Sequence, residues 1–105
     1  MSRMKEIVKK YGEDYMLRQL AEECTELAQA ALKLIRARRK ETPMREDEAK
    51  EHLIEEVADV TVMLKGLYDT MFDAPMMDAV NDFHIEKVNR MYTRMLDGEM
   101  EEDVW

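Results

Sequence analysis

Apolar residues recur at spacings of three and four along most of the chain, which is the period of an α-helix with one buried face. The pattern predicts four helices, over residues 3 to 11, 13 to 39, 47 to 72 and 76 to 96. No stretch alternates apolar and polar residues in the manner of a half-buried strand. Because the connections are short, neighbouring long helices are expected to pack antiparallel. The predicted fold is therefore all-α and similar to a four-helix bundle.

Glycine and proline mark the predicted breaks between these helices. Gly12 follows the first helix, Pro43 lies in the predicted loop after the second, and Pro75 follows the third. These residues disfavour continuation of a helix in different ways: glycine accepts a left-handed backbone, and proline restricts the residue before it. We therefore expect residues 1 to 98 to form a single all-α domain and residues 99 to 105 to form an acidic tail.

The two longest helices carry the most extensive apolar stripes. The stripe of the second helix consists of Leu17, Leu20, Ala21, Cys24, Leu27, Ala28, Ala31 and Ile35. The stripe of the third consists of Leu53, Val57, Val60, Leu64, Leu67 and Met71. Each stripe is expected to face the core. Cys24 is thus predicted to be a small core residue, and as the only cysteine it excludes an intramolecular disulfide.

Composition and charge narrow the function classes. The 105 residues carry a formal charge of -8, with a pI near 4.8, whereas proteins that bind nucleic acid polymers or membrane surfaces usually present a basic patch. No apolar run approaches the roughly 20 residues of a membrane span. The first residues precede no apolar signal core, so a cytoplasmic location is expected. An acidic protein that acts on phosphates would need metal ions as intermediaries.

Each of the two longest helices carries a pair of acidic residues beside its apolar stripe. Glu23 and Glu26 lie three residues apart on the second helix, and Glu56 and Asp59 lie three apart on the third. Residues at this spacing share a helix face, so each pair can direct two carboxylates at one point. Antiparallel packing of the two helices would gather all four. Four anions repel unless cations lie among them, and oxygen ligands suit magnesium or manganese.

Acidic residues three apart are also common on solvated helix faces, and either pair alone fits that description. Both pairs, however, flank an apolar stripe and lack nearby compensating cations. On a helical wheel of about 100° per residue, Glu22 and Glu55 point farther from the core and are weaker ligand candidates. Gln19 shares the strip of Glu23 and is a candidate contact to substrate. His52 lies one turn before Glu56, where it could orient that carboxylate, bind substrate or be an ordinary partly exposed histidine.

The fourth helix supplies the opposite charge. Lys87, Arg90 and Arg94 lie along one flank of its apolar face, where they could bind a polyphosphate chain. The alternative is a solvated flank whose cations pair with acidic neighbours such as Glu86. Spacing does not distinguish the two interpretations.

With these residues in place, the chain resembles the MazG-like family of all-α nucleoside triphosphate pyrophosphohydrolases. That family carries Glu-x-x-Glu on one helix and Glu-x-x-Asp on the next, which Glu23, Glu26, Glu56 and Asp59 match. The segment from residue 22 to 27 is similar to the family's EExxEL, and that from 55 to 60 is similar to its EExxDV. The resemblance covers about residues 5 to 95.

The resemblance implies hydrolysis of a nucleoside or deoxynucleoside triphosphate between the α- and β-phosphates. It implies that the four acidic residues hold Mg²⁺, with Mn²⁺ as an alternative, and that the subunits form a homodimer or homotetramer. Glu26 or Glu56 would act as general base. Lys87 and Arg90 would match the family's later basic positions, with Asn89 or Arg94 as alternatives. Neither the base nor the sugar of the substrate follows from the motif.

Two other classes of function stay open. One is a noncatalytic nucleotide-binding or regulatory module on the same fold. The other is a helical interaction protein whose acidic strips are only solvated surface. Nucleotide binding without product would indicate the first, and the absence of any metal-dependent change in melting temperature would indicate the second.

Overall fold

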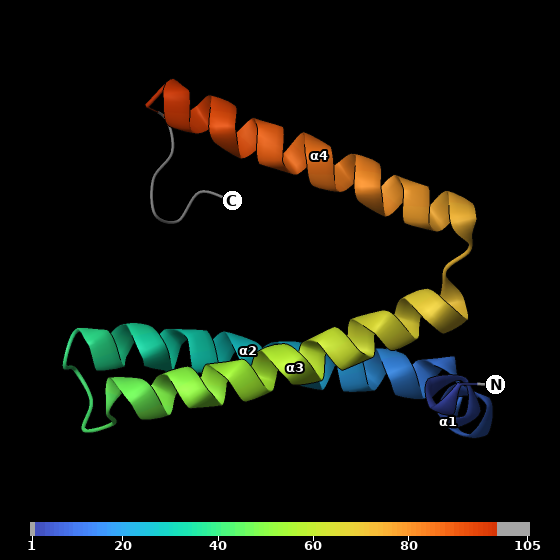
Figure 1. Ribbon diagram of the computed structural model, residues 1–105, viewed down its shortest axis with the longest axis horizontal. Coiled ribbons are helices and arrows are strands. Elements are labelled where there is room, and N and C mark those ends of the chain that lie inside the picture. The colour runs from blue at the N-terminus through green and yellow to red at the C-terminus, as the bar shows by residue number, and fades with distance from the viewer. Residues whose placement is uncertain (1, 99–105) are drawn as a thin grey trace. The chain divides into compact units, whose positions relative to one another are not determined.

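The structure is a computed structural model that describes residues 2 to 98. Within that range it contains four helices and no strand, so the all-α class is confirmed (Figure 1). The helices are α1 (Arg3–Tyr11), α2 (Glu13–Arg38), α3 (Glu46–Met71) and α4 (Ala74–Leu96). The acidic tail expected at residues 99 to 105 lies outside the described residues. The chain divides into two compact units, Met1–Met71 and Phe72–Trp105.

The ends of α1 follow from local backbone chemistry. Ser2 precedes the helix, and its hydroxyl accepts the backbone N–H of Lys5 at 3.1 Å, which satisfies one of the free donors of the first turn. Gly12 separates α1 from α2 with φ of 92°, in the region that favours glycine. Its N–H donates to the carbonyl of Val8 at 2.7 Å. The glycine stop predicted at this position is therefore confirmed.

The turn after α2 reverses the chain and returns it alongside the same helix. The N–H of Glu41 donates to the carbonyl of Arg36 at 2.9 Å, and that of Lys40 donates to the carbonyl of Ala37 at 3.2 Å. These two hydrogen bonds are the usual pattern at the C-terminal end of a helix that is followed by a residue with left-handed backbone. Lys40 is that residue, with φ of 56°. In consequence α3 runs antiparallel to α2 (Figure 1).

The boundary between α3 and α4 differs from the prediction by a few residues. Pro75 was expected to lie in the break between the third and fourth helices, but it lies in the first turn of α4. The first-turn N–H groups of a helix have no partner within it, so proline is tolerated there. Asp73 caps the helix, and its carboxylate accepts the N–H of Met76 at 2.9 Å.

Burial in α2 and α3 follows a repeat of seven residues. On α2 the repeat consists of Met16, Glu23, Ala30 and Ala37, and on α3 it consists of Ala49, Glu56, Met63 and Thr70. None of these side chains is exposed. A seven-residue repeat of buried positions is the pattern of two helices packed along one seam. We call these positions the seam; Glu23 and Glu56 occupy it together with apolar residues.

The stripe predicted to be the core of α2 is not the packed face. Ile35 is 41% exposed and Leu17 is 45% exposed, and Cys24 is also exposed. The prediction that Cys24 is a core residue is therefore wrong for the described chain. On α3, Val60 and Leu67 are buried as predicted, but Val57 is exposed. The physical reason is that α3 packs on the neighbouring strip of α2. The period of apolar residues identifies an apolar side of a helix, but it does not identify which part of that side a second helix covers.

Helix α1 packs on both long helices, and its contact with α3 depends on Gly66. A Cβ atom at Gly66 would lie 2.7 Å from Cγ of Met4 and 2.8 Å from Cε of Met16. Real Cβ contacts are essentially never this short, so a larger residue would have to displace a methionine. Gly66 thus provides the space that Met4 of α1 occupies against α3.

Helix α4 forms most of the described part of the second unit. It has 23 residues and none of them is buried; Val88 and Met95, for example, are 51% and 54% exposed. Phe83, Ile85, Tyr92 and Leu96 are likewise exposed. Among the helices of residues 2 to 98, none has the length and apolar character needed to cross a membrane.

Candidate metal centre

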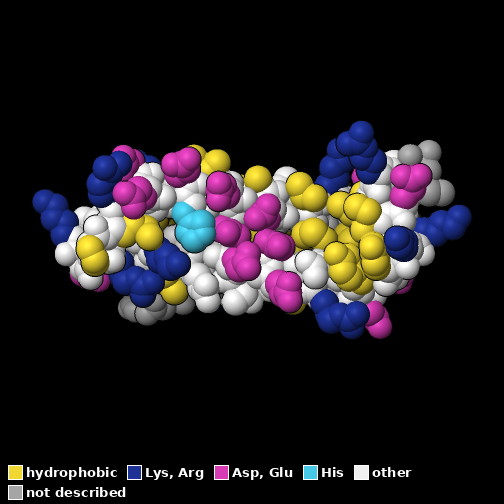
Figure 2. Space-filling view, turned by 90° about the horizontal axis from the view of Figure 1, so that it is seen from below, with side chains coloured by type: hydrophobic (Ala, Val, Ile, Leu, Met, Phe, Trp, Pro, Cys, Tyr) yellow, Lys and Arg dark blue, Asp and Glu magenta, His cyan; other side chains and the backbone are white. Residues whose placement is uncertain are grey.

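Four carboxylates meet where α2 and α3 pack against each other. Glu23 and Glu26 come from α2, and Glu56 and Asp59 come from α3. One oxygen from each residue lies within 4.8 Å of those of the other three. Figure 2 shows acidic side chains gathered on one face of the molecule, with a histidine beside them. We call these four residues the carboxylate cluster.

The cluster has an inner and an outer pair. Glu56 is only 8% exposed and Glu23 is half-buried, because both occupy the seam. Glu26 and Asp59 lie three residues farther along their helices and are exposed. The site therefore combines two carboxylates that water reaches poorly with two that water reaches freely.

Each residue of the inner pair has one carboxylate oxygen that lacks a hydrogen-bond partner among the described residues. Oε2 of Glu23 and Oε2 of Glu56 are buried and have no hydrogen-bond partner. Burying an unpaired charge costs much more than burying a neutral polar group, so such atoms are rare in folded proteins and call for a partner. Moreover, no lysine or arginine of residues 2 to 98 forms an ion pair with any member of the cluster. A cation from solution is the partner that the chemistry of these atoms favours.

The pKa values of the inner pair shift in the same sense. Loss of water raises the pKa of Glu23, and the negative charges of Glu26, Asp59 and Glu56 raise it further. Loss of water also raises the pKa of Glu56, again with Glu26 and Asp59 as the repelling charges, while His52 partly opposes the shift. Without a cation, the cluster therefore favours protonation of its buried carboxyls.

The cluster fits a hard divalent ion. All four groups are carboxylates, which suit magnesium, manganese or calcium better than softer metals. Oxygens on opposite sides of a magnesium ion lie about 4.2 Å apart, given bonds of about 2.1 Å. The separations of up to 4.8 Å are close to that value. Small side-chain movements would therefore suffice for the four residues to hold an ion.

Two further residues lie beside the cluster. Nε2 of His52 is 3.4 Å from Oε1 of Glu56, and the histidine side chain is 38% exposed. Gln19 lies one turn before Glu23 on α2 and is half-buried. Both were candidate site residues from their spacing in the sequence, His52 relative to Glu56 on α3 and Gln19 relative to Glu23 on α2.

The predicted phosphate-binding cations all lie on α4. Lys87 and Arg90 are exposed and Arg94 is half-buried. Nη2 of Arg90 is 3.2 Å from Oε1 of Glu86, which is the acidic pairing that the alternative interpretation expected. Exposed ion pairs of this kind contribute about 0 to 1 kcal/mol, so Glu86 holds Arg90 only weakly.

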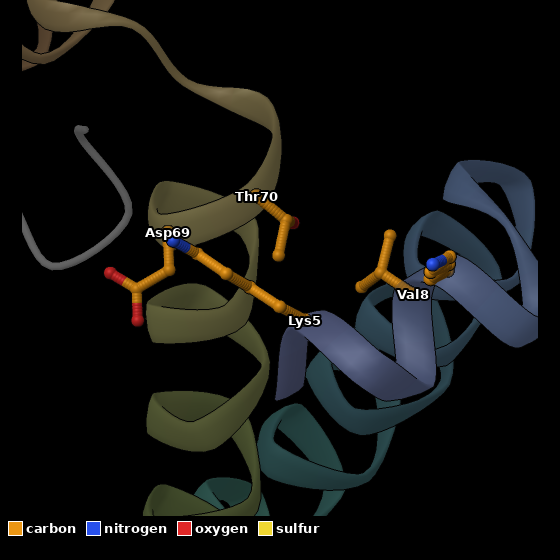
Figure 3. A pocket seen from close by; sticks show the side chains of 5 residues that line it. Lys5, Val8, Asp69 and Thr70 are labelled. Atoms are coloured by element: carbon orange, nitrogen blue, oxygen red, sulfur yellow. The ribbon is translucent and has the colours of Figure 1, made fainter. Parts of the chain in front are cut away.

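A separate pocket lies between α1 and α3 (Figure 3). It is lined by Lys5, Val8, Lys9, Asp69 and Thr70 and has a volume of about 400 Å³. Asp69 follows Asp59 by ten residues on α3, or about 15 Å at 1.5 Å per residue. The pocket is therefore distinct from the carboxylate cluster.

The position of the inner pair in the seam was missed from the sequence. The available signal was the seven-residue spacing that joins Glu23 to Met16 and Ala30, and Glu56 to Ala49 and Met63. Comparisons of the chain with protein-family models, curated proteins and solved structures found no match. The fold and the site thus define the chain as an all-α protein with a four-carboxylate cluster.

Proposed function

We propose that the protein is a metal-dependent nucleoside triphosphate pyrophosphohydrolase that releases a nucleoside monophosphate and pyrophosphate. The observation that carries the proposal is the convergence of four carboxylates, two of which have a buried oxygen without a partner. The resemblance to the MazG-like family supplies the reaction. Four carboxylates repel the phosphates of a nucleotide, so a nucleotide would bind near the cluster through metal ions held there.

Glu23, Glu26, Glu56 and Asp59 would hold Mg²⁺, or Mn²⁺ in its place. Such an ion, when bound, lowers the pKa of coordinated water and neutralises charge on a leaving phosphate. Of the two candidate general bases, Glu26 is exposed and Glu56 is buried. We therefore assign proton acceptance from the attacking water to Glu26, whose carboxylate water can reach, and assign Glu56 mainly to holding the ion.

Lys87, Arg90 and Arg94 would bind the phosphates of the substrate. Guanidinium groups form paired hydrogen bonds with phosphate oxygens, which fixes orientation as well as charge. Gln19 would contact the substrate from the edge of the cluster, since it lies one turn from Glu23.

The fold would be a MazG-type bundle that is completed by a homodimer or homotetramer. Support comes from large apolar side chains left exposed on both long helices. They are Leu17, Leu32 and Ile35 on α2 and Ile54, Val57 and Val62 on α3. Soluble chains rarely leave so many apolar groups uncovered, and a symmetric second copy is the commonest cover. Analytical ultracentrifugation should therefore give a mass of two or four chains, and a monomer would contradict this part of the proposal.

The experiment that tests the activity is a panel of canonical, deoxy and modified nucleoside triphosphates. Each is incubated with the protein and magnesium or manganese, and pyrophosphate and orthophosphate are measured separately. We expect pyrophosphate and the monophosphate from at least one nucleotide, and none when a chelator is present. Orthophosphate alone would contradict cleavage between the α- and β-phosphates. Nucleotide binding with no product would select a noncatalytic nucleotide-binding module instead.

A further inference from the structure

We propose that His52 is a positioning residue, which holds the carboxylate of Glu56 so that its buried oxygen faces the metal ion. The inference rests on the proposed metal site and extends it to a residue outside the four ligands. It assigns to His52 no contact with the ion or with the reacting phosphate.

The two oxygens of Glu56 have different surroundings. Oε1 lies 3.4 Å from Nε2 of His52. Oε2 is buried and has no partner. Because the two oxygens of a carboxylate are rigidly connected, a group that holds Oε1 also fixes the direction of Oε2. His52 can therefore set the orientation of the atom that remains available to a cation.

Glu56 needs such support because its other neighbours repel it. The charges of Glu26 and Asp59 act on the same side chain, and His52 is the neighbour whose charge acts in the opposite sense. No lysine or arginine in the described part of the chain pairs with Glu56. A ring N–H of histidine is thus the available donor, and it does not need a charged ring in order to donate.

The contact between His52 and Glu56 is loose in this structure. The separation of 3.4 Å exceeds the usual range of an N–H···O hydrogen bond, about 2.7 to 3.2 Å. Carboxylates that bind metals are themselves commonly hydrogen-bonded by a surrounding group, and loss of that group typically weakens metal affinity by about 10- to 100-fold. We expect the nitrogen and oxygen to approach more closely when Glu56 holds an ion.

The test uses calorimetric titration of the full chain with Mn²⁺. His52→Ala removes the donor, whereas His52→Gln retains one, since Nε2 of glutamine is as many bonds from Cα as Nε2 of histidine. His84→Ala on α4 is the matched control, because it changes the other histidine of the chain, which is exposed. Circular dichroism of each metal-free variant checks that the helices are retained.

We expect His52→Ala to weaken Mn²⁺ affinity about 10- to 100-fold, and His52→Gln to restore it to within about threefold of the unaltered chain. His84→Ala should bind as the unaltered chain does. Unchanged affinity in His52→Ala would overturn the inference while leaving the metal site intact, and so would loss of affinity that glutamine does not restore. If the unaltered chain bound no Mn²⁺, the proposed function itself would fail, and the inference with it.

Discussion

The pair α2 and α3 and the helix α4 both carry charged residues at helical spacing, but only the pair buries one of them. Each long helix places a glutamate in the seam, so packing brings Glu23 and Glu56 together. Helix α4 carries Lys87, Arg90 and Arg94 but has no buried residue. A row of charged residues on one helix therefore becomes a partly buried cluster where a neighbouring helix packs beside it, as α3 does beside α2.

The largest expected effect is that of Glu56→Gln, which removes one charge from the inner pair while keeping the shape of the side chain. A metal ion contributes several kcal/mol to stabilisation of the transition state, so we expect magnesium-dependent pyrophosphate release to fall by about a thousandfold or more. Steady-state kinetics with the best nucleotide of the panel measure this. The control is Glu55→Gln, which changes the adjacent exposed glutamate and should retain activity. Equal losses in both variants would remove the distinction between seam and surface.

A smaller effect is expected from α4. Arg90→Ala and Arg94→Ala should each lower kcat/KM by about 10- to 100-fold, since hydrogen bonds to charged groups contribute about 1.5 to 3 kcal/mol. The affinity for Mn²⁺ should not change in either variant, because the four proposed ligands lie on α2 and α3. Lys65→Ala, an exposed cation on α3, is the control and should be neutral. Full activity in both arginine variants would mean that the basic row is only solvated surface.

Gly66→Ala tests the packing within the first unit. Alanine improves helix propensity by about 1 kcal/mol, but overpacking typically costs about 1 to 3 kcal/mol, and the new Cβ would meet two methionines. We expect a net loss of about 1 kcal/mol in the free energy of unfolding, measured by urea titration. The double variant with Met4→Ala makes room for the new methyl group. It should be more stable than the sum of the two single changes predicts; simple additivity would contradict the close approach at Gly66.

The smallest effect is a dependence of stability on pH in the presence of a chelator. Folding raises the pKa of Glu23 and Glu56 above the ordinary value of 4.5, so the folded chain binds more protons than the unfolded chain. The stabilisation of the folded chain by these bound protons is fully present below the ordinary glutamate pKa, and it is lost as pH rises through the raised pKa values. The melting temperature should therefore be higher at pH 5 than at pH 8.

The double variant Glu23→Gln with Glu56→Gln isolates the inner pair from the general charge of the chain. Its melting temperature should change less between pH 5 and pH 8 than that of the unaltered chain. Added Mn²⁺ should raise the melting temperature of the unaltered chain most at pH 8, where the carboxylates are free of protons. An equal pH response in both proteins would show that the buried carboxyls do not cause it.

Sequence patterns predicted most of the helix boundaries, because glycine, proline and capping side chains act locally. Ser2, Gly12 and Asp73 end or begin helices through their own backbone or side-chain bonds. The spacing of acidic residues also identified the four members of the cluster. Each pair needs only the period of its own helix to share a face.

The packed face of α2 could not be predicted in the same way. The exposed stripe that includes Leu17 and Ile35 is at least as apolar as the seam, which contains Glu23. Which of two adjacent strips is covered depends on the partner helix, and that information is not local to α2. The burial of Glu56 followed from the same nonlocal choice, and so did the difference between inner and outer carboxylates.

The proposed metal centre is tested most directly by anomalous X-ray scattering from crystals of the full chain grown with Mn²⁺. We expect an anomalous peak among Glu23, Glu26, Glu56 and Asp59, with Oε2 of Glu56 directed toward it. The peak should disappear in crystals of Glu56→Gln grown in the same way. Crystals of the unaltered chain with Mn²⁺ bound elsewhere, and no peak within the cluster, would contradict the assignment of these carboxylates as a metal centre.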